Sequence, residues 1–170
     1  MADVTVDVLV VTFARREGRR GPGAGRPAKL YARAPGEVVV QLPPRDDALA
    51  GHLLAAAIEA DATGAAREAL RDVARSHGEL VGRALGEGGD LLQALTERGY
   101  EPAEDEWGIR LRNCPFHHLV GEHLELVCGL NEDLLGAALA ASGAPMTARL
   151  DPRPGHCCVL LEPTGAAPTP

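Results

Sequence analysis

The sequence predicts a mixed α+β fold in which helices and strands occupy separate parts of the chain. Residues 4–13 and 37–42 are rich in β-branched side chains, which favours strands near the N-terminus. Between residues 46 and 99, apolar residues recur at helical spacing. Beyond residue 100, two pairs of short extended stretches flank a long helical segment. We therefore expect an N-terminal β-hairpin, Ala-rich helices and a C-terminal ββαββ unit.

Length and composition narrow the class of protein. The chain has 170 residues, enough for one domain or two small subdomains. With 45% hydrophobic and 24% charged residues, it is not a wholly disordered chain. Its longest apolar runs, at 8–11 and 53–58, are far shorter than the roughly 20 residues of a membrane span. No secretory pattern opens the chain, so we expect a cytoplasmic protein with no membrane partner.

The first expected element is a hairpin within residues 1–43. Its strands are 4–13 and 30–33, and the connection between them contains four glycines and two prolines. Residues 14–33 contain seven basic side chains and one acidic one, a local charge of +6. Because the whole chain carries −7, the remainder sums to −13. A basic segment on an acidic body indicates contact with a polyanion, and a solvated loop is the simpler alternative.

Three helices are expected within residues 44–99. The first begins near Asp46 with Leu49, Leu53, Ala56 and Ala60 on one face, and Asp90 caps the third. The second spans about 63–85, with a stripe formed by Ala66, Leu70, Val73, Leu80 and Ala84. We expect His77, near this stripe, to be a partly buried histidine with a backbone partner. Ala-rich helices with few aromatic residues are typical of dimer interfaces, so we expect a homodimer.

The ββαββ unit is expected to occupy residues 100–162. Its first two strands surround Trp107, and the last two are 147–150 and 157–161. The helix of 116–141 is expected to break near Gly129, with Asn131 as the cap of its second half. Residues 163–170 are expected to form a disordered tail.

All four cysteines lie in this unit, and they are Cys114, Cys128, Cys157 and Cys158. Their spacing is not that of a zinc ribbon. Adjacent residues of a strand point to opposite faces, so only one of Cys157 and Cys158 is expected to serve a given site. Three cysteines and a histidine remain a candidate ligand set, because His117, His118, His123 and His156 are nearby in the sequence. Thiolates favour zinc, copper(I) or iron–sulfur clusters, whereas buried thiols that simply pack are the alternative.

A catalytic thiol is the weakest of the candidate functions. Cys114 followed by His117 or His118 offers a nucleophile and a base, but such pairs are defined by the fold rather than by spacing. The GPGAGR stretch has neither the spacing of a dinucleotide fingerprint nor a helix after it, and no phosphate-binding GxxxxGK[ST] loop is present. We therefore do not expect an enzyme.

The motifs RRGPGAGRPAKLY, LRNCPFHHLV, ELVCGLN and ARLDPRPGHCCV together resemble the ArsR-like winged helix-turn-helix transcriptional regulators of actinobacteria. The resemblance extends from about Val11 to Leu161. It implies that the basic hairpin is the wing and that the wing contacts DNA phosphates and the minor groove. The implied DNA-binding residues are Arg15, Arg16, Arg19, Arg20, Arg26 and Lys29.

The resemblance also sets limits on DNA recognition. Members of the family carry a recognition helix before the wing, whereas only about 13 residues precede the basic loop here. We expect this chain to lack the DNA-reading helices, either because translation starts further upstream or because it is a natural remnant. DNA binding is then weak, salt-sensitive and non-specific, since base specificity normally comes from the major groove.

The C-terminal unit is similar to the sensor region of the iron–sulfur-biogenesis repressors, in which cysteines hold a cluster. Cys114, Cys128 and Cys157 match that pattern, while Ser142 stands near the place of a further cysteine. The fourth ligand is then Cys158, a histidine such as His123, a small thiol or a group of the partner subunit. The expected cofactor is an iron–sulfur cluster, with zinc or no metal as alternatives. The leading function is a truncated transcriptional regulator with a cysteine-based sensor, and a stand-alone metal- or redox-binding module is the alternative.

Overall fold

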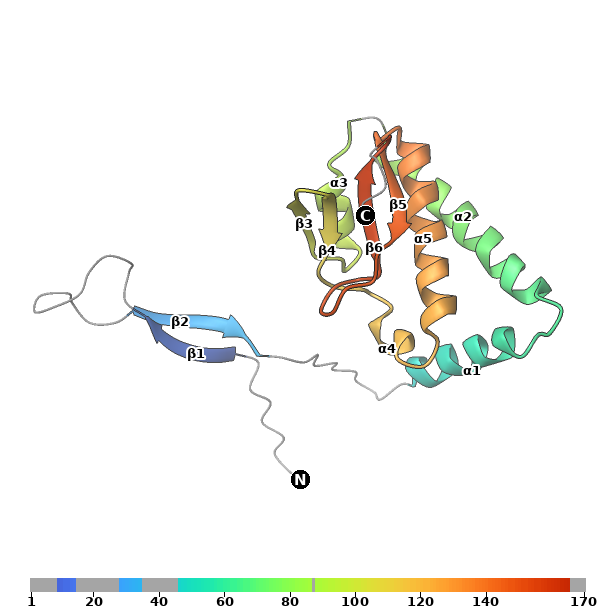
Figure 1. Cartoon of the computed structure of the whole chain (residues 1–170), viewed down its shortest axis with the longest axis horizontal. Coiled ribbons are helices and arrows are strands. Elements are labelled where there is room, and N and C mark those ends of the chain that lie inside the picture. The colour runs from blue at the N-terminus through green and yellow to red at the C-terminus, as the bar shows by residue number, and fades with distance from the viewer. Residues whose placement is uncertain (1–8, 15–27, 35–45, 87, 166–170) are drawn as a thin grey trace, which may run out of the picture. The chain divides into compact units, whose positions relative to one another are not determined.

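The computed structural model describes residues 9–14, 28–34, 46–86 and 88–165 (Figure 1). The chain divides into two compact units, with the boundary in the sequence between Arg45 and Asp46. In the first unit, β1 (Leu9–Ala14) pairs with β2 (Ala28–Arg33) in an antiparallel hairpin. Leu9 lies opposite Arg33, and Ala14 lies opposite Ala28. The predicted hairpin is confirmed for these two strands. The connection 15–27 and the extended stretch 37–42 lie outside the described residues.

The second unit begins with three helices, α1 (Asp47–Glu59), α2 (Ala65–Leu85) and α3 (Leu91–Glu97). The carboxylate of Asp46 accepts a hydrogen bond from the backbone N–H of Leu49, 3.0 Å away, and thereby caps α1. Asp90 caps α3 in the same way through the N–H of Gln93, also at 3.0 Å. The helix starts predicted from Asp46 and Asp90 are confirmed, because a capping carboxylate is a strictly local signal.

The remainder of the unit is a mixed arrangement of strands and helices. In chain order it contains β3 (Pro102–Asp105), β4 (Gly108–Leu111), α4 (His117–Val120), α5 (Leu124–Ser142), β5 (Met146–Leu150) and β6 (Val159–Pro163). The four strands form one antiparallel sheet of order β3-β4-β6-β5. The mixed helix and strand content agrees with the predicted α+β class.

The helical stretch between the strand pairs differs from the prediction. It is interrupted between α4 and α5, around Gly121, and not at Gly129. Asn131 lies in the middle of α5 with no exposed surface, so it caps no helix. The prediction of a break and cap at Gly129 and Asn131 was wrong because the Asn131 side chain is bound by tertiary partners, described below.

Helix α5 packs against β5 and β6 and also packs lengthwise against α2 (Figure 1). The buried face of α2 consists of Ala74, Gly78 and Gly82. A Cβ atom on Gly78 would collide with the carbonyl oxygen of Leu134, and one on Gly82 would collide with that of Ala138. The two helices therefore approach so closely that only glycine fits at these positions.

Because of this contact, the face of α2 that is buried differs from the predicted one. The predicted apolar stripe faces outward, since Val73 is 66% exposed and Leu80 is 60% exposed. His77 is exposed as well, contrary to the partly buried environment expected for it. On α1 the inward residue is Ala55, whereas Leu49 and Leu53 are exposed. Small residues occupy the buried positions because close helix packing excludes larger side chains.

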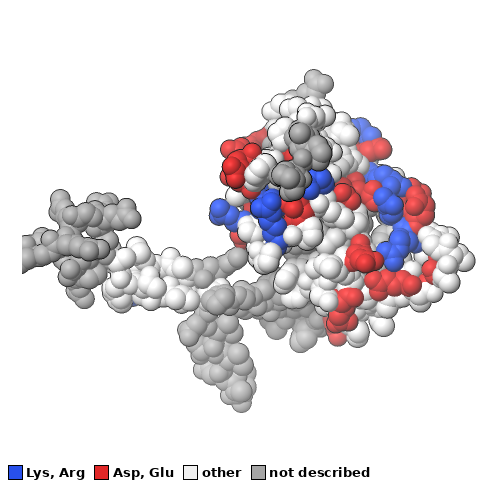
Figure 2. Space-filling view, in the orientation of Figure 1, with Lys and Arg blue, Asp and Glu red and all other residues white. Residues whose placement is uncertain are grey.

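Residues 46–99 of the helical segment and the cysteine-containing segment 100–162 contribute to the same compact unit. Its core joins Leu95 and Tyr100 to residues of the sheet and of α5. On the face shown in Figure 2, acidic and basic side chains are interspersed over this unit. Among the described residues, no helix combines the length and apolar character that crossing a membrane requires.

Candidate functional site

Three segments that are distant in sequence bring the four cysteines into one region of the core. Cys114 follows β4, Cys128 lies in α5, and Cys157 and Cys158 immediately precede β6. Strands β4 and β6 are neighbours in the sheet, and α5 packs against β6. The backbone N–H of Cys157 donates to the carbonyl of Leu111 at the end of β4, at 2.8 Å. This bond anchors the cysteine pair beside the strand that leads to Cys114.

The loop that carries the cysteine pair is held by ion pairs of the buried Arg110 side chain with two partly exposed carboxylates. Arg110 is only 5% exposed, although its neighbours in the sequence predict an outward side chain. Its guanidinium donates to Asp105 at 3.2 Å and to Asp151 at 2.7 Å. The N–H of Asp151 in turn donates to the carbonyl of Cys158 at 2.7 Å. Arg110 therefore ties β4 to the segment that positions Cys157 and Cys158, and both partner carboxyls have a lowered pKa.

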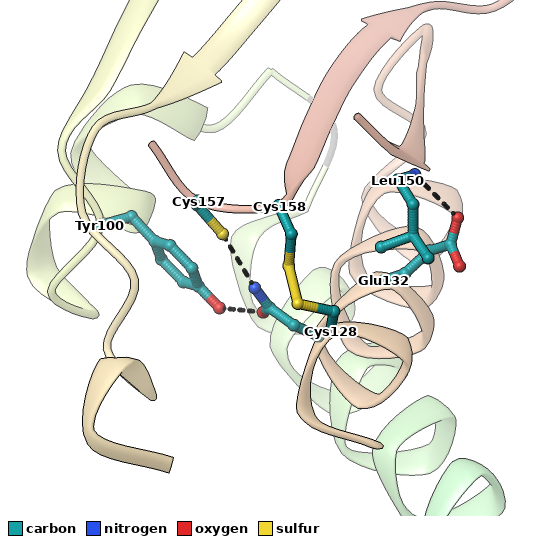
Figure 3. The surroundings of a disulfide bond; sticks show 7 residues. Tyr100, Cys128, Glu132, Leu150, Cys157 and Cys158 are labelled. Carbon is teal, nitrogen blue, oxygen red and sulfur yellow. Dashed lines mark hydrogen bonds between the residues drawn. A yellow bond between two sulfur atoms is a disulfide. The ribbon is translucent and has the colours of Figure 1, made fainter. Parts of the chain in front are cut away.

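Cys128 and Cys158 form a disulfide, with their Cα atoms 6.1 Å apart (Figure 3). The bond joins α5 to the start of β6. Cys114 and Cys157 are the two free cysteines. Adjacent Cys157 and Cys158 thus have different partners, although both precede β6 and do not lie within the strand predicted at 157–161.

Cys157 takes no part in the disulfide, and a dashed line in Figure 3 marks the hydrogen bond that its sulfur accepts. The Asn131 side-chain N–H donates to Sγ of Cys157 at 3.2 Å. The amide oxygen of Asn131 accepts from the Tyr100 hydroxyl at 2.6 Å. Because Asn131 and Tyr100 are both buried, this chain of bonds fixes the orientation of the amide and directs a donor at the thiol.

These contacts give the two free thiols different acidities. The Cys114 thiol donates to Cys157, which lowers the pKa of Cys157 from its ordinary 9.0 to about 7. Burial opposes this shift, while the backbone N–H groups of Val159 and Cys158 and the amide of Asn131 support it. The same hydrogen bond, together with burial, raises the pKa of Cys114. The pair therefore consists of a thiolate-forming Cys157 and a neighbouring proton donor.

A cavity of about 280 Å³ gives access to this pair. Its wall includes Cys114, Cys157 and Cys158, together with His117, Arg153 and His156. Cys157 itself is only 2% exposed, so a reagent reaches its sulfur from the cavity and not from the open surface. A cavity of this size admits a small oxidant or a low-molecular-weight thiol reagent.

The four sulfur atoms suit the cofactors that the sequence predicts only when the Cys128–Cys158 disulfide is reduced. Sulfur ligands favour zinc or iron–sulfur clusters. With Cys128 and Cys158 joined, the structure offers two free thiols, Cys114 and Cys157, where the resemblance implies three cysteine ligands. Reduction of the disulfide releases the other two sulfurs in the same core. The residues therefore fit a zinc ion or a cluster in the reduced form and not in the disulfide form.

His123, a candidate fourth ligand, belongs to different surroundings. Its Nδ1 is 2.7 Å from a carboxylate oxygen of Glu59 on α1, and its ring lies 5.4 Å from that of His52. His123 does not line the cysteine cavity, whereas His117 and His156 do. If a histidine completes a cysteine site, the structure favours one of these two.

Of the expected DNA-binding residues, Lys29 lies in the part of the chain that the structure describes. Arg15, Arg16, Arg19, Arg20 and Arg26 lie outside the described residues. Lys29 lies on β2 and is exposed, with its ammonium nitrogen 5.0 Å from the centre of the Tyr31 ring. The hairpin strands that would carry the basic loop are therefore present.

Asn131 and Tyr100 are the site residues that sequence reasoning missed. A signal for Asn131 was available, because it is a polar residue within a largely apolar helical stretch. Such a residue marks a buried polar contact when it falls on the inward face of a helix. Nothing in the sequence identifies Tyr100 as its partner.

Comparison of the chain with protein-family models, with curated proteins and with solved structures finds no match. The resemblance to ArsR-like regulators therefore stays a prediction that rests on the motifs quoted for it.

Proposed function

We propose that this chain is a regulatory protein in which the unit from residue 46 onward senses oxidants through its cysteines, and in which the basic hairpin contacts DNA. The observation that carries the proposal is the free pair Cys114 and Cys157 at a cavity, beside a disulfide in the same core. Redox-sensing cysteines typically combine a lowered pKa, an access route and a nearby second cysteine. Cys157 has all three.

A hydroperoxide is the oxidant class that suits this pair. The Cys157 thiolate attacks the outer oxygen of the peroxide, the O–O bond breaks, and Cys157 becomes a sulfenic acid as an alkoxide leaves and takes up a proton. The Cys114 thiol then attacks the sulfenic sulfur, and water leaves with the thiol proton. Overall, two thiols and one hydroperoxide give a Cys114–Cys157 disulfide, an alcohol and water.

Metal or cluster binding belongs to the same proposal as the reduced state of the site. Cys114 and Cys157 would hold the group, joined by Cys128 and Cys158 once their disulfide is reduced. When bound, such a cluster supplies sensitivity to oxygen and to redox poise. Ligation and disulfide formation exclude each other at Cys128 and Cys158. Oxidation of these residues therefore competes directly with occupancy.

Helix α5 is the element that transmits the change. It carries both Cys128 and Asn131, and it packs closely against α2 at Gly78 and Gly82. A contact this close leaves little room for adjustment, so a shift of α5 displaces α2. The outward face of α2, with Val73 and Leu80, is the surface we propose for the homodimer.

DNA contact is assigned to the N-terminal hairpin because its charge is opposite to that of the rest of the chain. The +6 of residues 14–33 attracts phosphates, whereas the −13 elsewhere is repelled by them. The contact is expected to be weak and to fall steeply with added salt, since it depends on the release of counterions.

The test compares the full chain, with its Cys128–Cys158 disulfide intact, before and after treatment with a hydroperoxide. Mass spectrometry is expected to show loss of two hydrogens on treatment and a new Cys114–Cys157 bond, while Cys114→Ser stops at the sulfenic acid, which a dimedone probe traps. DNA affinity, measured by fluorescence anisotropy at several salt concentrations, is expected to differ between the two forms. No reaction at Cys157 contradicts the sensor proposal. A reaction that leaves DNA affinity unchanged supports a stand-alone redox module instead.

A further inference from the structure

A second cluster of metal-binding side chains lies where α1 meets the turn between α4 and α5. His52 lies on α1, and Glu122 and His123 lie in the turn. Within the described part of the chain, these three residues each place a ligand atom within 4.8 Å of the others. The Nδ1 atom of His52 is 3.7 Å from a carboxylate oxygen of Glu122.

Two buried histidine nitrogens in this cluster lack hydrogen-bond partners. They are Nδ1 of His52 and Nε2 of His123. His123 is only 6% exposed, so water does not readily compensate its unpaired nitrogen. A buried polar atom without a partner is costly, and native proteins rarely leave one. Two such atoms in adjoining rings indicate that a bound group completes the site.

The other nitrogen of His123 determines which atom is available. Its Nδ1 lies 2.7 Å from the Glu59 carboxylate, and because an ionised carboxylate can only accept, Nδ1 carries the hydrogen of this bond. The lone pair is then on Nε2, the atom without a protein partner. Metal-binding histidines commonly donate their second N–H to a carboxylate, which orients the ring and raises its basicity. Glu59 occupies that supporting position here.

We propose that His52, Glu122 and His123 bind one divalent transition-metal ion of the zinc class, with Glu59 orienting His123. Two imidazoles and one carboxylate are a recognised ligand set for zinc, and they leave a fourth position for water. The harder ions magnesium and calcium prefer oxygen ligands, so this set disfavours them. The ion joins α1 to the α4–α5 turn and is independent of the cysteine chemistry, because none of the three ligands lines the cysteine cavity.

A bound metal ion would also help to attach α1 to the rest of the second unit. Helix α1 turns Leu49 and Leu53 outward, and it buries only Ala55 fully, while His52 and Ile58 are half-buried. A metal ion that bridges α1 to the turn supplies an attachment that apolar packing does not. Metal binding is therefore expected to raise the Tm of the full chain.

The experiment uses the metal-free full chain with its Cys128–Cys158 disulfide intact. Binding of Zn²⁺ is measured by calorimetry, and binding of Co²⁺ is measured by absorption spectroscopy. We expect one equivalent to bind, with visible Co²⁺ bands and without the near-ultraviolet charge-transfer band that thiolate ligands produce. Glu122→Gln and His52→Gln are expected to weaken binding at least tenfold, and Glu59→Gln to weaken it by roughly 10- to 100-fold. Glu122 is 73% exposed on its side chain, so its substitution leaves folding intact.

The matched control is His77→Gln, which removes an exposed histidine of α2 and is expected to leave affinity unchanged. Three results overturn the proposal: absence of Zn²⁺ binding with no change in Tm, equal affinity in Glu122→Gln and the wild type, or a Co²⁺ spectrum dominated by thiolate charge transfer. The first of these leaves His123 hydrogen-bonded to Glu59 without a metal. Failure of this site leaves the cysteine proposal untouched, and the reverse also holds.

Discussion

The acidity of Cys157 offers the most direct test of the cysteine site. The perturbation is Cys114→Ala, which removes the donor that contributes most to the lowered pKa of Cys157. Cys114→Ser is the reference, because its hydroxyl donates in the same place. While the Cys128–Cys158 disulfide is intact, Cys157 is the only free thiol in either variant.

The magnitude follows if removal of Cys114 returns the pKa of Cys157 from about 7 to its ordinary 9.0, with the effect of burial and that of the remaining donors offsetting each other. At a pKa of about 7, half of Cys157 is thiolate at pH 7, whereas at its ordinary 9.0 about 1% is. The rate of a thiolate reaction thereby falls about 50-fold. Each remaining thiolate is more nucleophilic by about 8-fold, using a Brønsted slope of roughly 0.45. Cys114→Ala is therefore expected to react about 6-fold more slowly than Cys114→Ser at pH 7 and about 7-fold faster at pH 10.

The assay measures the rate of mixed-disulfide formation with 2-hydroxyethyl disulfide from pH 5 to pH 10, and ultraviolet absorption of the thiolate gives the pKa independently. The two pH–rate profiles are expected to cross slightly above pH 8. Access through the cavity is the same in both variants, so it does not produce a crossing. Superimposable profiles with equal pKa values would refute the argument that Cys114 lowers the pKa of Cys157.

Three further predictions concern packing and assembly. Gly78→Ala is expected to destabilise the protein by about 1–3 kcal/mol, because the added methyl meets the α5 backbone, whereas Gly129→Ala, with nothing within 4 Å, is expected to stabilise it by about 0.5–1 kcal/mol. Urea unfolding measures both, and equal effects contradict the close-packing argument. Asn131→Ala is expected to cost about 1–3 kcal/mol, since it leaves the buried Tyr100 hydroxyl unpaired. The same titration checks this, and an unchanged midpoint counts against the network. Leu80→Lys, on the outward face of α2, is expected to shift a homodimer to monomer in light scattering, and a monomeric wild type contradicts the proposed dimer surface.

Local signals in the sequence were sufficient for most of the elements. Asp46 and Asp90 begin helices as capping residues do, and the turn at Trp107 separates two short strands. Each of these signals acts over three or four residues, so the unfolded sequence already contains it. The break predicted at Gly129 failed because burial in the core outweighed a local preference at Asn131.

The candidate site was only partly predictable. The grouping of four cysteines in one unit indicated that they would meet, and the alternation of neighbours on a strand indicated that Cys157 and Cys158 would have separate partners. Their pairing was not predictable, because Cys128 and Cys158 are 30 residues apart and meet only through the packing of α5 on the sheet. The same holds for His123, whose partners on α1 lie more than 60 residues earlier.

The sequence by itself determined the α+β class, the hairpin, the helix starts and the basic segment on an acidic body, since these depend on composition and on contacts between near neighbours. The tertiary structure alone decided which face of α2 is buried, which sulfurs are bonded and which thiol is acidic. These outcomes depend on how closely two helices approach and on donors that come from distant segments. Distances of that kind are set when the core packs, and no local pattern encodes them.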